Sequence, residues 1–139
     1  MAIKQTYRIY DADVGLMVYS NTETAGYVWM VNPTSGEVEC CEDTDGSELI
    51  VVPGSVERSI GRWDKNQQEI YEGDIIGWNL MTGVIYWEDC SFCLRWLGVY
   101  PLPDGEEAPR PDDLVANVPL NRSEVVGNIH ENQELLDNA

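Results

Sequence analysis

Short stretches of alternating apolar and polar residues recur along the chain, and clusters of turn-forming residues separate them. A period of two is typical of half-buried β-strands, and Gly, Pro, Asn and Asp mark the turns between strands. The pattern therefore predicts an antiparallel, mainly β domain. We expect its strands near residues 7–10, 16–19, 27–31, 48–52, 74–78, 83–87 and 91–96.

The chain after residue 96 has a different character. Residues 97–120 contain five of the seven prolines and show little periodicity, which indicates a loop. Residues 123–129 then resemble a strand that a Gly-Asn pair interrupts. Asn132 is a suitable N-cap for a helical turn, so we expect a short C-terminal helix over residues 133–136.

The excess of acidic residues argues against some classes of function. The chain has 139 residues with 25 Asp or Glu and eight Lys or Arg, a net charge of −17. Because nucleic-acid and anionic-membrane binding depend on basic residues, we expect neither. No apolar run approaches the ~18 residues of a membrane span, and the N-terminus lacks the apolar segment of a signal peptide. We therefore expect a cytoplasmic protein.

The acidic residues are unevenly distributed. One run without a basic residue contains Glu37, Glu39, Glu42, Asp43, Asp45 and Glu48. Such a run is typical of a solvated face that keeps a protein soluble. It is equally the composition of a surface that attracts a basic partner. Both interpretations stay open at this stage, and the run is the candidate acidic interaction surface.

Residues that could carry chemistry form no complete site in the sequence. Cys90 and Cys93 have the spacing of half a zinc site, but no second pair follows. Cys40 and Cys41 are neighbours on a predicted strand, so their side chains point to opposite faces. His130 is the only histidine, and no phosphate-binding glycine motif occurs. We predict free thiols, no metal, no cofactor, no catalytic residue and hence no enzyme.

The run GRWDKNQQEIYEGDI at residues 61–75 is more specific. Three further stretches occur in a matching order: residues 7–11 with 17–19, residues 83–89 followed by Phe92, and residues 125–136. Together they resemble the YopX family of small bacteriophage and prophage proteins. The resemblance covers about half of the chain and leaves residues 20–55 and 97–120 uncovered.

The resemblance implies a β-rich fold with an SH3-like barrel in its C-terminal part, a phage or prophage origin, and self-association. On this basis we expect one domain over residues 1–139, with a β meander over 1–58 and the barrel part over 59–136. The family implies no activity. Its motif positions are expected to serve the fold: Glu69, Tyr71, Gly73, Asp74, Gly127 and Asn128. Gln67 and Cys90 replace the usual turn glycines, so looser hairpins are expected there.

Two functions remain as hypotheses. The first is a non-enzymatic phage accessory protein that binds a protein partner, such as a basic host protein, and forms homo-oligomers. The second is an acidic DNA mimic that inhibits a host nucleic-acid-binding defence or regulatory protein. Five tryptophans and seven tyrosines favour protein interfaces. Since protomers at −17 repel each other, association is predicted to strengthen as salt rises.

Overall fold

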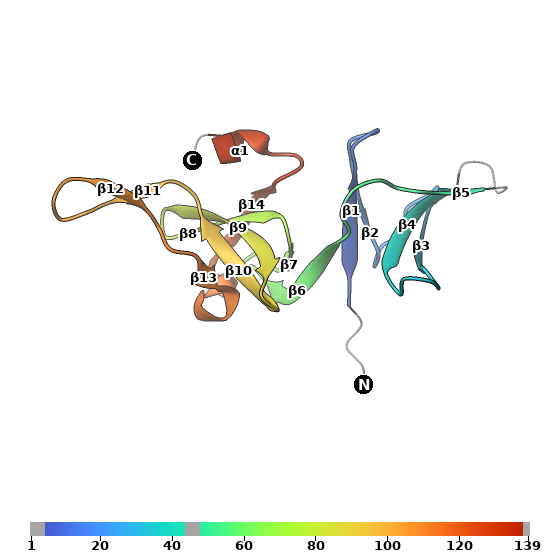
Figure 1. Cartoon of the computed structure of the whole chain (residues 1–139), viewed down its shortest axis with the longest axis horizontal. Helices are drawn as coiled ribbons and strands as arrows, with labels where there is room; N and C mark the ends of the chain where they lie inside the picture. The colour runs from blue at the N-terminus through green and yellow to red at the C-terminus, as the bar shows by residue number, and fades with distance from the viewer. Residues whose placement is uncertain (1–4, 44–47, 138–139) are drawn as a thin grey trace. The chain divides into compact units, whose positions relative to one another are not determined.

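The computed structural model describes residues 5–43 and 48–137 (Figure 1). These residues form antiparallel strands, two short 3-10 turns and one short helix, so the prediction of a mainly β fold is confirmed. The chain divides into an N-terminal unit of residues 1–58 and a C-terminal unit of residues 59–139. Among the described residues, no helix has the length and apolar composition needed to cross a bilayer.

The N-terminal unit contains a hairpin and a three-stranded sheet. Its strands are β1 (Tyr7–Asp11), β2 (Leu16–Tyr19), β3 (Tyr27–Val31), β4 (Val38–Asp43) and β5 (Leu49–Val51). Strands β1 and β2 pair with each other, and β1 also pairs with the first residues of β6 (Glu57–Trp63). Strands β3, β4 and β5 pair in that order. The core of this unit is small and comprises Ile9, Val18, Cys40 and Val52.

The C-terminal unit is organised around a curled, half-barrel sheet with the strand order β13-β10-β9-β8-β14. Its strands after β6 are β7 (Glu69–Tyr71), β8 (Asp74–Trp78), β9 (Met81–Glu88), β10 (Ser91–Trp96), β11 (Val99–Pro101), β12 (Glu107–Pro109), β13 (Asp113–Leu114) and β14 (Glu124–Asn128). Helix α1 (Gln133–Asp137) follows, so the predicted C-terminal helix is confirmed. The core comprises Ile70, Ile76, Ile85, Leu94, Trp96, Val115, Val118 and Leu120.

All seven predicted strands are present, but the prediction was incomplete. It lacked β4, β6 and β7, whereas the strand expected within residues 123–129 is present as β14 (Glu124–Asn128). The interpretation of the Pro-rich segment as a plain loop was wrong. That segment forms the β11–β12 hairpin, strand β13 and two 3-10 turns, η1 (Val115–Asn117) and η2 (Leu120–Arg122). Prolines and single-turn elements hide periodicity, although Val115, Val118 and Leu120 are core residues.

The two hairpins expected to be loose are tight. Gln67 has a φ of 65° and Cys90 a φ of 61°, so both adopt the left-handed conformation without being glycine. In the first turn, the Asp64 carboxylate accepts the N–H groups of Asn66 and Gln68, each at 2.9 Å. The second turn is fixed by the paired strands β9 and β10 on either side of Asp89 and Cys90. The surrounding bonds therefore hold a conformation that the turn residues disfavour.

Candidate interaction surfaces

One face of the three-stranded sheet in the N-terminal unit is apolar and solvent-exposed. The strand registers place Val28 beside Cys41 and Cys41 beside Val51, and the alternation adds Met30 and Leu49 to the same side. We call these five residues the outer face. The exposed fractions of its four larger side chains run from 39% to 52%. An unpartnered apolar sheet face of this kind is typical of a binding surface.

Cys40 and Cys41 show how β4 separates the two sides of this sheet. Cys40 lies in the core of the unit, while Cys41 lies on the outer face beneath larger neighbours, with its Sγ 3.5 Å from Met30 Sδ. Burial raises the pKa of Cys40 to about 11, with Cys41 and Asp11 adding to the effect. Burial and the charge of Glu39 also raise the pKa of Cys41. Both thiols therefore stay protonated near neutral pH and act as small apolar side chains.

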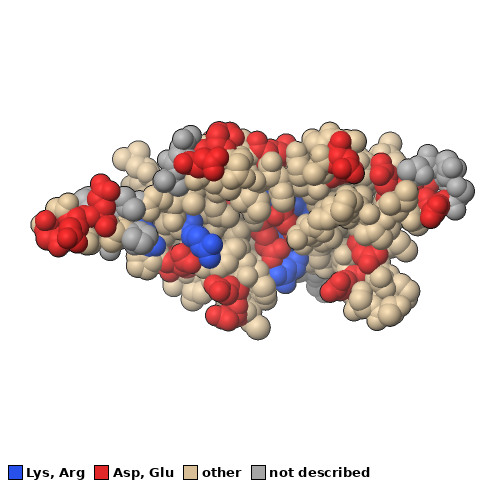
Figure 2. All heavy atoms as spheres, turned by 45° about the horizontal axis from the view of Figure 1, so that its top comes forward, with Lys and Arg blue, Asp and Glu red and all other residues tan. Residues whose placement is uncertain are grey.

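The six residues of the candidate acidic surface do not form a single row. Glu39 and Asp43 lie on the outer-face side of β4, whereas Glu42 lies on the opposite side. Glu37 and Glu48 are exposed next to the ends of β4 and β5, and Asp45 lies outside the described residues. Figure 2 shows acidic side chains scattered over the visible face and few basic ones. The structure thus places Glu39 and Asp43 on the central strand, beside Met30 and Leu49 of the outer face, rather than in one dense acidic array.

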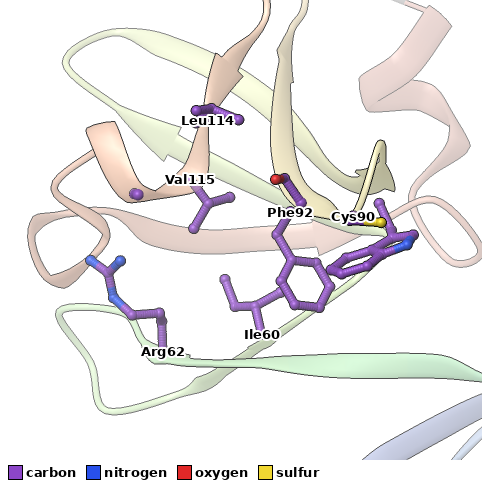
Figure 3. A pocket seen from close by; sticks show the side chains of 9 residues that line it. Ile60, Arg62, Cys90, Phe92, Leu114 and Val115 are labelled. Atoms are coloured by element: carbon purple, nitrogen blue, oxygen red, sulfur yellow. The ribbon is translucent and has the colours of Figure 1, made fainter.

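A second candidate surface is a groove of about 310 Å³ in the C-terminal unit (Figure 3). Its apolar side chains come from β6, β9, β10, β13 and η1: Ile60, Trp87, Phe92, Leu114 and Val115. The rings of Trp87 and Phe92 pack edge to face, with centroids 4.7 Å apart. Strand β13 pairs with β10 and is followed directly by η1. The residues at this junction, Leu114 and Val115, line the groove.

The ends of this groove are polar. Figure 3 shows Arg62 at one end and Cys90 at the other, with Ile60, Phe92 and Val115 between them. Arg62 makes no hydrogen bond or ion pair with any other described residue. A guanidinium group binds carboxylates well through its planar fork of N–H donors. The groove can therefore hold an apolar side chain and place an acidic group beside it.

The family-motif positions lie elsewhere, and several of them bind backbone groups. The Asp64 carboxylate is almost fully buried and also accepts the N–H of Val125 at 2.9 Å, which joins the β6–β7 turn to β14. Asp74 accepts the N–H of Tyr71 at 2.8 Å. Gly73 has a φ of 83° and bonds through its backbone to Ile85 and Ile129. These residues connect strands of the half-barrel.

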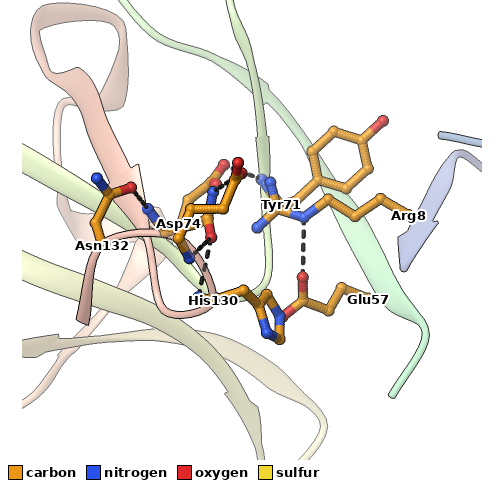
Figure 4. Close-up of polar contacts among 8 residues, drawn as sticks. Arg8, Glu57, Tyr71, Asp74, His130 and Asn132 are labelled. Carbon is orange, nitrogen blue, oxygen red and sulfur yellow. Dashed lines mark hydrogen bonds and ion pairs between the residues drawn. The ribbon is translucent and has the colours of Figure 1, made fainter. Parts of the chain in front are cut away.

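The closing motif forms a turn that depends on one glycine and two asparagines. Figure 4 shows Asn132 and His130 of this turn, with hydrogen bonds drawn as dashed lines. Asn128 Oδ1 accepts the N–H groups of His130 and Glu131, and Asn132 Oδ1 accepts the N–H of Asn128. A Cβ on Gly127 would lie 2.5 Å from Asn132 Oδ1, so a larger residue there would displace the capping side chain. The asparagine side chains accept hydrogen bonds from backbone N–H groups, so these positions stabilise the turn.

Glu69 and Tyr71, the remaining motif positions, lie on strand β7. The hydroxyl of Tyr71 lies 3.4 Å from the Glu69 carboxylate, a long contact between two side chains of the same strand. Tyr71 is buried, and its backbone N–H is the group that Asp74 binds. Both residues therefore belong to strand β7, which pairs with β6 and carries the core residue Ile70 between them.

The residues considered for metal or acid–base chemistry are not gathered into a site. Cys90 is exposed, and Cys93 Sγ lies 3.8 Å from the carbonyl oxygen of Ser91. Within the part of the chain that the structure describes, no three His, Cys, Asp or Glu side chains come together as metal ligands.

Sequence reasoning missed the groove and the outer face. The groove combines segments that are more than 50 residues apart, so no local pattern could reveal it. The outer face had a readable signal: residues 27–31 and 49–52 are apolar at every position rather than at alternate ones. A continuous apolar strand is apolar on both faces.

Known proteins with a related sequence or structure agree with this fold. A family model described as "YopX protein" matches residues 6–137. The chain is similar in structure to protein EF1440 from Enterococcus faecalis, whose crystal structure superimposes with a TM-score of 0.55. The similarity covers 97% of this chain and 99% of the other at 19% sequence identity, so it shows a shared fold alone. No curated protein matches the chain.

Proposed function

The chain belongs to the YopX family, and from this premise we propose that it is a non-enzymatic phage or prophage accessory protein that acts by binding other proteins. The outer face of the N-terminal unit is the observation that carries this proposal. It presents Val28, Met30, Leu49 and Val51 to solvent, and the fold assigns them no core to fill. Apolar side chains at the centre and polar groups at the rim are the usual anatomy of a protein interface.

The carboxylates on the outer-face side of β4 indicate what kind of partner would bind. Glu39 and Asp43 lie on the same side of β4 as the apolar residues, and Glu48 is exposed next to β5. A partner with an apolar patch and lysines or arginines around it would match both the centre and the rim. Charge attraction of this kind increases the association rate, and the apolar centre holds the complex.

The non-enzymatic part of the proposal has its own support. The buried carboxylates of Asp64 and Asp74 are engaged with backbone N–H groups, which accounts for them as parts of the fold. The DNA-mimic hypothesis has less support, because a mimic requires dense carboxylates on one surface. Here β4 carries Glu42 on the side opposite Glu39 and Asp43.

The test is affinity capture from host lysate with the full chain as bait, followed by measurement of the purified prey's dissociation constant. We expect the wild type to capture a basic protein. The affinity of Met30→Asp for this protein should be at least tenfold lower than that of the wild type. Glu39→Gln with Asp43→Asn should slow association and reduce its salt dependence. Val14→Asp is the matched control, because Val14 is exposed on the β1–β2 turn and outside the outer face.

Two results would contradict the proposal. One is a prey that binds Met30→Asp as well as it binds the wild type. The other is a prey that is a nucleic-acid-binding protein and is displaced by competing duplex DNA, which would favour the DNA mimic instead.

A further inference from the structure

The hairpin between β8 and β9 carries a residue that the fold does not explain. Its two turn residues, Asn79 and Leu80, have φ values of 51° and 64°. A two-residue turn of this type favours asparagine and glycine, because both central residues are left-handed. Leucine is disfavoured there, and the side chain of Leu80 is fully exposed, at 107%. Leu80 therefore occupies a strained position without any packing inside its own chain.

The surroundings make this tip an apolar projection. Trp78 and Met81 flank the turn and pack against the core of the C-terminal unit. The rings of Trp78 and Trp96 lie 6.2 Å apart, which gives the base of the hairpin a rigid aromatic support. Trp78 and Met81 also line a hollow of about 270 Å³. Asp113 lines it too, and its carboxylate accepts the indole N–H of Trp96 at 2.6 Å.

The groove and the projection lie at opposite ends of the same strand. Strand β9 begins at Met81, next to the projection, and ends at Glu88, next to the groove residue Trp87. Eight strand residues span roughly 26 Å at about 3.3 Å per residue. A hairpin tip therefore cannot reach the groove of its own C-terminal unit, whereas the tip of another copy can.

We propose that the Leu80 tip of one copy inserts into the apolar groove of a second copy, which gives head-to-tail self-association. The groove has apolar walls on which a leucine side chain can pack, formed by Phe92, Leu114 and Val115. Arg62, at the end of the groove, makes no ion pair with any other described residue, and the incoming copy carries a net charge of −17.

A tip-to-groove contact predicts an assembly larger than a dimer, either a ring or a filament. A contact between two different surfaces leaves one tip and one groove free at the ends, so further copies can add. This inference deepens the proposed function, since it supplies the contact for self-assembly. It uses the C-terminal unit only, whereas the proposed partner site lies on the outer face of the N-terminal unit.

The test is sedimentation of the full chain at tens of micromolar, with Leu80→Asn as the tip variant and Leu114→Glu as the groove variant. Asparagine suits the left-handed turn, so Leu80→Asn should fold normally, which circular dichroism checks. We expect the wild type to form species larger than dimers and each variant to associate at least tenfold more weakly. Val14→Asn should behave as the wild type, because Val14 lies in the N-terminal unit.

Mixing the two variants gives the decisive measurement. Leu80→Asn keeps an intact groove and Leu114→Glu keeps an intact tip, so the mixture should form a one-to-one dimer that grows no further. A wild type that stays monomeric, a Leu80→Asn variant that assembles like the wild type, or a mixture that stays monomeric would each overturn the inference.

Salt and one further variant separate this inference from the proposed function. Association should strengthen from ~10 to ~150 mM salt, because screening reduces the repulsion between acidic copies. If Met30→Asp abolishes assembly and Leu80→Asn does not, the contact uses the outer face, which overturns the inference and leaves the proposed function intact. If Leu80→Asn abolishes assembly but still binds the basic prey, both stand. Leu80-dependent binding to phosphatidylcholine vesicles by a monomeric chain would assign the tip to a membrane instead.

Discussion

The two units are built from the same kind of antiparallel strands, but their turns differ. In the N-terminal unit the left-handed turn positions are glycines: Gly15, Gly26, Gly36 and Gly54. In the C-terminal unit five described residues other than glycine have positive φ: Gln67, Asn79, Leu80, Asp89 and Cys90. The N-terminal unit thus has relaxed turns, and the C-terminal unit holds several strained ones.

The unit with the strained turns has the larger core. Eight buried residues form the core cluster of the C-terminal unit, and four form that of the N-terminal unit. A larger core supplies more stabilisation, so it can hold local conformations that cost free energy. Strained turns therefore occur in the unit whose packing can hold them, and the unit with the small core leaves apolar side chains exposed.

The largest expected effect tests how far the small core depends on one ion pair. Arg8 and Glu57 lie opposite each other on β1 and β6, 2.9 Å apart, and both are almost fully buried. Arg8→Met leaves a buried carboxylate without this partner, so we expect a loss of about 3–5 kcal/mol in the free energy of unfolding. Urea titration measures it.

The control for that variant is an exposed ion pair. Lys65 and Glu124 lie 3.5 Å apart with about half of each side chain exposed. Lys65→Met should cost no more than about 1 kcal/mol. Equal losses for the two variants would mean that burial of the Arg8 pair contributes nothing.

The next effect compares the core of the C-terminal unit with the outer face. Ile76 is fully buried in the half-barrel, so Ile76→Ala should cost about 2–5 kcal/mol. Val51 is half exposed on the outer face, and Val51→Ala should stay within about 0.5 kcal/mol of the wild type. A large loss for Val51→Ala, measured by urea titration, would show that the outer face stabilises the unit and is not reserved for a partner.

A smaller effect tests the strain in the turns. Glycine at position 90 removes a left-handed penalty of about 1–2 kcal/mol but adds freedom to the unfolded chain. We expect Cys90→Gly to stabilise the protein by about 0.5–1 kcal/mol in thermal unfolding. Cys90→Ala removes the thiol and keeps the strain, so it should give no gain. If Cys90→Gly and Cys90→Ala stabilised the protein equally, the gain would come from removal of the thiol rather than from relief of backbone strain.

The smallest effect concerns one tyrosine in each unit. A hydrogen bond to Asp11 raises the pKa of Tyr27 to about 12, and one to Asp112 does the same for Tyr86. Because the folded pKa exceeds the unfolded value near ~10, this stabilisation is present below pH ~10 and is lost as pH rises towards 12. Ultraviolet titration of the wild type should show Tyr27 and Tyr86 ionising late. Asp11→Asn should remove one late tyrosine from the profile, and an unchanged profile would contradict the assignment.

Much of the fold could be predicted from local patterns, but the surfaces could not. A run of β-branched and aromatic residues closed by turn residues identified the strand Tyr27–Val31, because such residues favour a strand whichever way they face. Local patterns did not reveal that Val115, Val118 and Leu120 complete a core, since 3-10 turns have no useful period over so few residues. The groove is a property of tertiary packing between Ile60 and Leu114, which no short window contains. The acidic run was visible, but its division between two faces required the register of β4.

The turn that begins at Asn32 has a consequence for the order in which the N-terminal sheet is assembled. Asn32 Oδ1 accepts the N–H groups of Thr34 and Ser35, and the backbone of Asn32 pairs with that of Gly36. Elsewhere in proteins a strand displaced by one residue exposes its apolar side chains, and this penalty selects the correct pairing. Here both sides of β3 are apolar, so a misaligned β3–β4 pair would bury nearly as much. The hydrogen bonds of the Asn32 turn therefore determine which residues of β3 and β4 pair with each other.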